Sequence, residues 1–172
     1  VGVMEGDSRE KIRENGGTLY LAADPLQLMP GLLTTGEVKR QTDFEDVGIP
    51  LRTIEEENHV VEDRMKDDIS VIAGVGEERI VILTGCSHAG IVNISRHAVE
   101  LSGRKSIGCI IGGLHLVEAP MERIQKTVAA LAKMEIRQVS AGHCTGFEAQ
   151  AELRTVLGSR FIPLHTGMKF EF

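Results

Sequence analysis

Three histidines in the second half of this chain each follow an apolar run that ends in glycine. His88 comes shortly after VILTG, His115 after CIIGG and His143 directly after QVSAG. Neutral imidazole is the commonest protein ligand for a borderline cation such as zinc. If the three runs are strands whose ends face a common crevice, the three rings meet at one sheet edge. The spacing therefore predicts a divalent-metal site made by these histidines.

The other histidines have a plainer interpretation. His59 lies beside an acidic run, His97 falls in the middle of a predicted helix, and His165 lies near a predicted strand. A single histidine in such a place more often makes a structural hydrogen bond or faces solvent. We therefore leave these three out of the predicted metal site.

The residues around His88 also permit nucleophilic chemistry. The sequence GCSHA, residues 85–89, loosely fits the G-x-S-x-G turn that exposes a serine between a strand and a helix. Ser87 would then be the nucleophile and His143 its base. Against this, the chain is short for that fold, and no acidic residue follows a strand end between the two to orient the base.

Two cysteines stand beside these candidates. Cys86 and Cys144 can act as thiolate ligands or redox groups, although cysteine is more often a small buried residue. Three cysteines at scattered spacing do not form the pattern of a disulfide framework. They indicate a reducing compartment, and we expect a cytoplasmic protein.

Composition excludes several classes of partner. With 172 residues, of which 42% are hydrophobic and 26% charged, the chain has the size and balance of one globular domain, residues 1–172. A net charge of −6 without a long Lys/Arg cluster argues against nucleic acid and anionic membranes. No apolar run approaches the roughly 18 to 20 residues that span a bilayer. A small-molecule substrate is the partner that remains.

Periodicity predicts strands and helices in alternation after residue 67. Two apolar runs around a five-residue connection, 74–78, predict a hairpin. Helical stripes and glycine stops then alternate with short apolar runs. The predicted helices are 91–103, one that opens with Pro120 at its first position, and 147–157, which begins with a capping box at 145–148; the predicted strands are 106–111, 136–141 and 169–172.

The first third gives weaker signals. Residues 7–14 predict a short helix capped by Asp7, and 18–23 alternate like a strand. Residues 24–50 hold three prolines and three glycines with no sustained period, so we expect a surface excursion there. Together the elements predict an α/β (α+β) protein, with helices packed on the outer face of a mixed sheet.

Several motifs carry a family resemblance. Several motifs in the right order along the chain resemble the metallo-β-lactamase-fold hydrolases of the 7,8-dihydropterin-6-methyl-4-(β-D-ribofuranosyl)aminobenzene-5′-phosphate synthase-like family: LTGCSHAGIVNI, IIGGLHL, AGHCTG, and the upstream GLLTTGEVKRQTDFE and DDISVIAGVGEERIVILTG. The resemblance runs from about residue 10 to the end. It implies an αβ/βα sandwich with one or two metal ions at a shared sheet edge. It also implies that His88 and His143 are ligands, with His115 where related enzymes place an acidic bridging ligand.

The resemblance implies a hydrolytic activity, but one motif of the family is missing from this chain. Such enzymes hydrolyse esters or phosphoesters with zinc, or with manganese or iron, and Thr35, Gly36 and Glu37 would shape the substrate pocket. The family's N-terminal H-x-H-x-D-H motif does not occur in this chain. We therefore expect the C-terminal half or more of the fold, weakly active or inactive alone, forming a homodimer or pairing with a missing N-terminal half. The alternative is a non-catalytic half-fold that binds metal or a partner.

Overall fold

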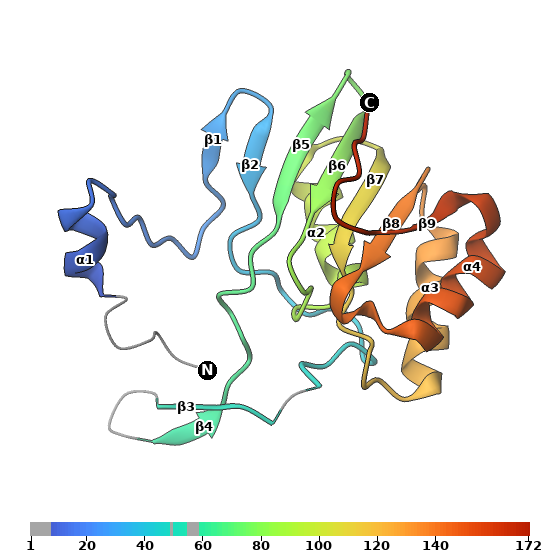
Figure 1. Ribbon diagram of the computed structural model, residues 1–172, viewed down its shortest axis with the longest axis horizontal. Helices are drawn as coiled ribbons and strands as arrows, with labels where there is room; N and C mark the ends of the chain where they lie inside the picture. The colour runs from blue at the N-terminus through green and yellow to red at the C-terminus, as the bar shows by residue number, and fades with distance from the viewer. Residues whose placement is uncertain (1–7, 49, 55–58) are drawn as a thin grey trace.

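A seven-stranded mixed sheet forms the body of the protein (Figure 1). The computed structural model describes residues 8–48, 50–54 and 59–172. The strand order is β1-β2-β5-β6-β7-β8-β9, and β3 pairs with β4 in a separate hairpin. The strands are β1 (Gln27–Met29), β2 (Leu32–Thr34), β3 (Arg52–Ile54), β4 (Val60–Glu62), β5 (Val71–Val75), β6 (Arg79–Leu83), β7 (Ser106–Gly113), β8 (Val139–Gly142) and β9 (Phe161–Pro163).

Strand direction divides the sheet into two parts. Strands β1, β2, β5 and β6 pair antiparallel, with short turns between β1 and β2 and between β5 and β6 and with the β3–β4 hairpin in the long connection from β2 to β5. From β6 to β9 all pairs are parallel, and each connection contains a helix: α2 (Ile91–Ser102), α3 (Met121–Lys133) and α4 (Phe147–Leu157). No helix among the described residues is long and apolar enough to cross a bilayer.

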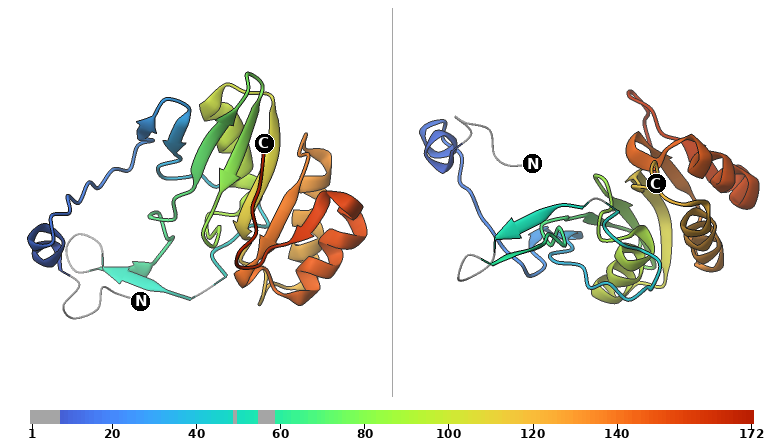
Figure 2. Two further views of the ribbon diagram at one scale, coloured as in Figure 1. Left: turned by 45° about the horizontal axis from the view of Figure 1, so that its top comes forward. Right: turned by 90° about the horizontal axis from the view of Figure 1, so that it is seen from below.

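All three of these helices lie on one face of the sheet. The parallel strands follow one another in chain order, so right-handed crossovers, the usual hand, place every connecting helix on the same side. The chain after β9 runs across the opposite face, as the two views show (Figures 1 and 2). The predicted class, a mixed sheet with helices on its outer face, is confirmed.

The core lies between this helical layer and the sheet. Strand residues alternate between the two faces, so Ile80 and Ile82 of β6 both point to the helical side and are fully buried. They pack with Ile107 and Ile110 of β7 and with the apolar stripes of the helices. At about 25 cal/mol for each Å² of apolar surface removed from water, this layer is the main source of stability.

The N-terminal part projects from the body (Figures 1 and 2). Every residue of α1 (Arg9–Glu14) is exposed, and the Ser8 side chain caps this helix by accepting from the Lys11 N–H. Tyr20 and Leu21 are 70% and 68% exposed. The prediction of a strand over 18–23 is wrong, because alternation alone does not form a strand without a neighbour to pair with. Asp7, the predicted cap, lies outside the described residues.

The segment between β2 and β3 is not a loose excursion, which corrects the prediction for 24–50. The whole β1–β2 hairpin lies within residues 24–50, and after it Val38, Glu45 and Val47 are buried. The Glu45 carboxylate accepts hydrogen bonds from the N–H groups of Val92 (2.9 Å) and Asn93 (3.0 Å) in the first turn of α2. Glycine at position 90 offers no capping side chain, so Glu45 satisfies these donors instead.

Most later elements follow the predictions, with three corrections. Helix α4 begins with Gly146 as its N-cap and lacks a side-chain cap, because the Thr145 hydroxyl donates to Gly142 O (2.6 Å) and accepts from the Leu114 N–H (3.2 Å). Pro120 is the N-cap of α3 and not its first helical residue. The last strand is β9 and not 169–172, where Phe170 and Phe172 stack on each other outside the sheet.

Candidate metal centre

The three predicted histidines follow the ends of three neighbouring parallel strands. His88 comes five residues after β6, His115 two residues after β7, and His143 directly after β8. The carboxyl ends of parallel strands meet at the same sheet edge, where ligands of open α/β sheets usually bind. The topology therefore brings these three loops to the same edge of the sheet.

His88 and His115 form a close pair. Their ring centroids lie 4.1 Å apart at an interplanar angle of 52°. Each ring has a buried Nδ1 atom with no hydrogen-bond partner among the described residues. Burial, followed by the charges of His88 and Arg123, lowers the pKa of His115, which favours the neutral ring. Two adjacent imidazoles with buried, unpaired Nδ1 atoms offer these nitrogens to a cation, whereas no hydrogen bond joins the two rings in the described part of the chain.

His143 lies with two thiols. The ligand atoms of Cys86, His143 and Cys144 are all within 4.8 Å of one another. Cys86 and Cys144 are half-buried and His143 is exposed. The Cys144 sulfur accepts from the His115 N–H at 3.3 Å, which connects this group to the histidine pair. Burial raises the pKa of Cys144 to about 11. The sequence predicted the histidine at this place and left the role of the thiols open.

The backbone is strained at these turns. Ser87, His115 and His143 have φ angles of 62°, 47° and 53°, a left-handed region that non-glycine residues seldom adopt. Such conformations persist only where the surroundings fix them, and they gather at functional sites. Gly113 permits the closest approach, because an added Cβ would lie 2.6 Å from the Cys144 sulfur and 2.8 Å from Gly85 O.

Ser87 does not have the position of a nucleophile. Its side chain is fully buried, its hydroxyl donates to Gly113 O (2.6 Å), and it shares a hydrogen bond with the Thr84 hydroxyl (2.9 Å). These contacts tie the loop after β6 to the end of β7. A serine nucleophile needs a base in reach and an open face, so the geometry argues against the serine-hydrolase alternative.

Charged residues that sequence reasoning missed hold the His88 loop. The Arg40 guanidinium donates to His88 O at 2.6 Å, and Asp68 accepts from the Ala89 N–H at 3.0 Å. Both residues lie in parts of the chain where periodicity gave no signal. They come from positions 48 and 21 residues away in sequence, so only the folded chain reveals their role.

An ion pair borders the other side of the histidine pair. Arg123 of α3 is buried and donates to Asp46 Oδ1 (2.5 Å) and to the Asp46 carbonyl (2.9 Å). An added Cβ on the neighbouring Gly48 would lie 3.0 Å from this guanidinium and 4.0 Å from the His115 ring. The segment that carries Glu45 and Asp46 therefore reaches the wall of the site.

The predicted pocket residues lie apart from the histidines. The Thr35 hydroxyl accepts from the Ser70 N–H at 3.0 Å and is fully buried, and Gly36 beside it is buried too. Glu37 is exposed and lines a cavity of about 330 Å³ that also touches Arg40, Asp68 and Ala89. Substrate binding by Thr35, Gly36 and Glu37 stays a prediction, and Glu37 is the one whose side chain faces a cavity next to the His88 loop.

The remaining histidines are where a structural role would put them. His97 Nε2 is 3.0 Å from Thr35 O, which ties α2 to the end of β2. His59 is exposed, and the exposed His165 ring has only Thr166 O within hydrogen-bond distance, at 3.1 Å. They take no part in the strand-end cluster.

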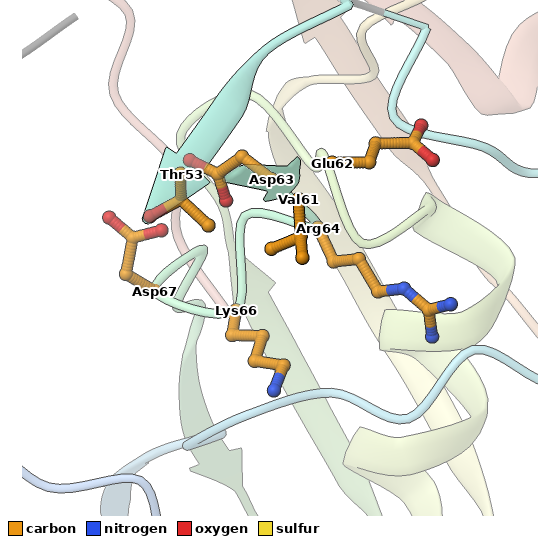
Figure 3. Close-up of a pocket in the computed structure, with 7 residues that line it drawn as sticks. All are labelled: Thr53, Val61, Glu62, Asp63, Arg64, Lys66 and Asp67. Carbon is orange, nitrogen blue, oxygen red and sulfur yellow. The ribbon is translucent and has the colours of Figure 1, made fainter. Parts of the chain in front are cut away.

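A larger cavity lies beside the β3–β4 hairpin, away from the strand ends (Figure 3). It has a volume of about 780 Å³. The carboxylates of Asp63 and Asp67 lie on the side of Thr53, whereas Arg64 and Lys66 extend the other way. This cavity is lined by both carboxylates and cations and by no histidine or cysteine, so it lacks the ligand set of the strand-end cluster.

Comparison with known proteins supports the fold described above. A crystal structure described as a metal-dependent hydrolase of the β-lactamase superfamily matches 95% of this chain and 61% of its own, with a TM-score of 0.75 and 23% identity. The chain thus has the metallo-β-lactamase fold. A scan of protein-family models gives no match.

Two curated proteins of Methanocaldococcus jannaschii are similar in sequence. One is 7,8-dihydropterin-6-methyl-4-(β-D-ribofuranosyl)-aminobenzene-5′-phosphate synthase, 36% identical over 174 residues, which covers 99% of this chain and 58% of the relative. The other is an uncharacterized protein, 27% identical over 149 residues, covering 87% of this chain and 53% of the relative. The chain therefore spans between half and two thirds of the length of the proteins it matches.

Proposed function

We propose that this chain belongs to the metallo-β-lactamase superfamily and carries the C-terminal part of a metal-dependent hydrolase site for esters or phosphoesters. The observation that carries the proposal is the strand-end cluster, in which His88 and His115 face each other with unpaired buried nitrogens and His143 lies on the next strand end. The fold supports it, because the structural neighbour is described as a metal-dependent hydrolase.

In this proposal His88, His115 and His143 hold a divalent cation, for which zinc fits the ligands best and manganese or iron are alternatives. A bound ion of this kind would activate a water molecule and polarise a scissile ester or phosphate. The chain's own residues fix the geometry. Arg40 and Asp68 hold the backbone on both sides of His88, and the Arg123–Asp46 pair fixes the segment against His115.

The ligand set of this chain is incomplete for a two-metal site. H-x-H-x-D-H is absent from its sequence, and the chain spans 58% of the synthase it resembles. We infer that further ligands come from a preceding N-terminal half or from a second copy. We therefore expect little or no hydrolysis by these 172 residues alone. The relative's name points to a sugar phosphate as the substrate class to try first.

A second copy has surface to bind. Apolar side chains on the projecting N-terminal segments are exposed, among them Tyr20 (70%), Leu21 (68%) and Ile54 (68%). Exposed apolar surface of this kind favours association, and a homodimer would cover it. Sedimentation equilibrium at micromolar concentration tests this, and a well-folded monomer would remove the homodimer from the proposal. The proposal also places the protein in the cytoplasm, where its three free thiols would stay reduced.

Metal content is the test of the proposed function. The protein is loaded with zinc, desalted and measured by elemental analysis beside His88→Ala/His143→Ala, with His59→Ala/His165→Ala as a control that removes two exposed rings outside the cluster. We expect near-stoichiometric zinc in the wild type and the control, and loss in the first variant. Equal zinc in all three proteins would contradict the proposal.

The alternative function is a non-catalytic module that binds metal or a partner. The observation that favours it is the absence of H-x-H-x-D-H from these 172 residues. Hydrolysis of p-nitrophenyl phosphate and p-nitrophenyl acetate separates the two when the zinc-loaded chain is fused behind an N-terminal half that carries H-x-H-x-D-H. Turnover by this fusion that His88→Ala abolishes supports the hydrolase, whereas bound zinc without turnover by the fusion supports the module.

A further inference from the structure

We propose that Cys86 and Cys144, together with His143, are the first ligands of the proposed cation, a two-thiolate, one-imidazole set that selects a thiophilic divalent ion such as zinc. This inference rests on the proposed metal function and names the atoms that first capture the ion. The three ligand atoms come from two strand ends and lie within 4.8 Å of one another. The site has one position left for water or for a further ligand.

The ligand atoms need to move only a short distance to bind one ion. Two sulfurs at about 2.3 Å from one tetrahedral zinc are about 3.8 Å apart. From a separation within 4.8 Å, the side chains need to approach by about 1 Å. Rotation about χ1 supplies such a movement, and the strained φ of 53° at His143 already turns its backbone into this corner.

One backbone donor and the local space suit a coordinating sulfur at Cys144, although burial raises the pKa of the free thiol to about 11. The His115 backbone N–H points at the Cys144 sulfur at 3.3 Å, a donor of the kind that supports a coordinating sulfur. Gly113 leaves the space that this sulfur occupies, since a Cβ there would lie 2.6 Å from it and 3.3 Å from the His143 ring. The Cys144 thiol donates to the Cys86 carbonyl at 3.6 Å, a weak hydrogen bond that costs little to replace by a bond to an ion.

The chemistry of the ligands sets the choice of ion. Soft thiolates prefer zinc over manganese or magnesium, which prefer carboxylate and water. Binding replaces the two S–H protons by two bonds to the ion, so two protons are released to the buffer for each ion bound. A site with two cysteines, one histidine and one open position is also a known arrangement for catalytic zinc. The exposed side of His143 leaves that position open to solvent.

The third cysteine provides a matched control. Cys109 lies in β7, is fully buried, and makes only weak contacts, to Ile110 O at 3.5 Å and the Gln138 side chain at 3.9 Å. It is outside the group that can hold an ion. A variant at Cys109 therefore removes one thiol of three without touching the proposed site.

The experiment is a titration of the reduced, metal-free protein with cobalt(II), which reports bound sulfur through a charge-transfer band in the near ultraviolet. We expect the band to saturate at one cobalt per chain and to disappear when zinc is added, but not when manganese is added. Cys86→Ser/Cys144→Ser should abolish the band, and Cys109→Ala should keep it. Circular dichroism checks that each variant is folded.

The same titration separates this inference from the proposed function. In His88→Ala/His115→Ala the thiol set is intact, so the band should remain within about twofold of the wild-type affinity. Stoichiometric cobalt without the band in the wild type would overturn the inference and leave the histidine site standing. A band that persists in Cys86→Ser/Cys144→Ser would overturn it as well, and no cobalt binding at all would overturn both.

Discussion

The two parts of the sheet differ in how they are built and in what they carry. Between β6 and β9 the strands are parallel, covered by α2, α3 and α4, and rich in fully buried residues such as Ile82 and Ile110. In β1 and β3 every residue is exposed. The cluster of thiols and imidazoles follows the strands of the parallel part, where the scaffold is most deeply buried.

The less buried part still contributes to the site, through its loops. Glu45 caps α2, Arg40 holds the His88 carbonyl, and Asp46 pairs with Arg123. These contacts come from one continuous segment, residues 40–46. In the proposed site, the parallel part would supply the ligands, and the segment before β3 would hold them in position.

The largest expected change in the free energy of unfolding comes from replacing a glycine in the parallel part of the sheet, compared with one in the antiparallel part. In β7, Gly112 has φ +147° and an added Cβ would lie 2.0 Å from Thr84 O, whereas in the β1–β2 turn Gly31 has φ +78° and no described atom within 4 Å of that position. Gly112→Ala should lower the free energy of unfolding by about 3 kcal/mol or more, because backbone must move. Gly31→Ala should cost about 1 to 2 kcal/mol, from its left-handed φ alone. Urea unfolding measures both, and equal costs would contradict the contrast.

A smaller change in the free energy of unfolding is expected at Glu45, where the segment before β3 contacts the parallel part. Glu45→Ala leaves the N–H groups of Val92 and Asn93 without their acceptor, and should lower the free energy of unfolding by about 1 to 2 kcal/mol. Asp43→Ala, at an exposed position in the same segment, is the control and should change it by less than about 0.5 kcal/mol. If the two variants are equally stable, the segment does not depend on this cap.

The smallest effect is a pH dependence. Burial raises the pKa of Glu45 above its ordinary value, although the N–H groups of Val92 and Asn93 and the Thr42 hydroxyl lower it in part. A folded pKa above the unfolded one stabilises the fold below about pH 4.5, and this contribution is lost as the pH rises through the folded pKa. Unfolding in urea from pH 4 to pH 7 should therefore show a smaller loss of stability in Glu45→Gln than in the wild type. An identical pH profile would contradict this.

The sequence was sufficient to predict helices and strands where the local residue pattern agrees with the packing in the folded protein. The proposed capping box and the terminal glycine predicted α4 at the residues where it lies, 147–157, although Thr145 does not cap it, and strand ends with histidines predicted the edge of the sheet. Prediction from the sequence failed where contacts between distant parts of the chain determine the structure. The alternation of 18–23 finds no strand to pair with, and the three residues of β9, which include a proline, are too few to give a periodic signal.

The candidate site shows the same division. His88, His115 and His143 were found because each follows a strand end. Their grouping was not predictable, because the pairing of two rings and the placement of the third with two thiols depend on loop conformations with left-handed φ angles. Arg40 and Glu45 act on residues 48 and 47 positions away, and nothing in their local sequence marks them.

Anomalous diffraction at the zinc absorption edge, from crystals of the zinc-loaded chain, tests the central claim most directly. The account predicts a peak at the ends of β6, β7 and β8, within bonding distance of His143 and its neighbouring ligands. A peak only in the carboxylate-bearing cavity beside β3 and β4 (Figure 3), or no peak in fully loaded crystals, would contradict it.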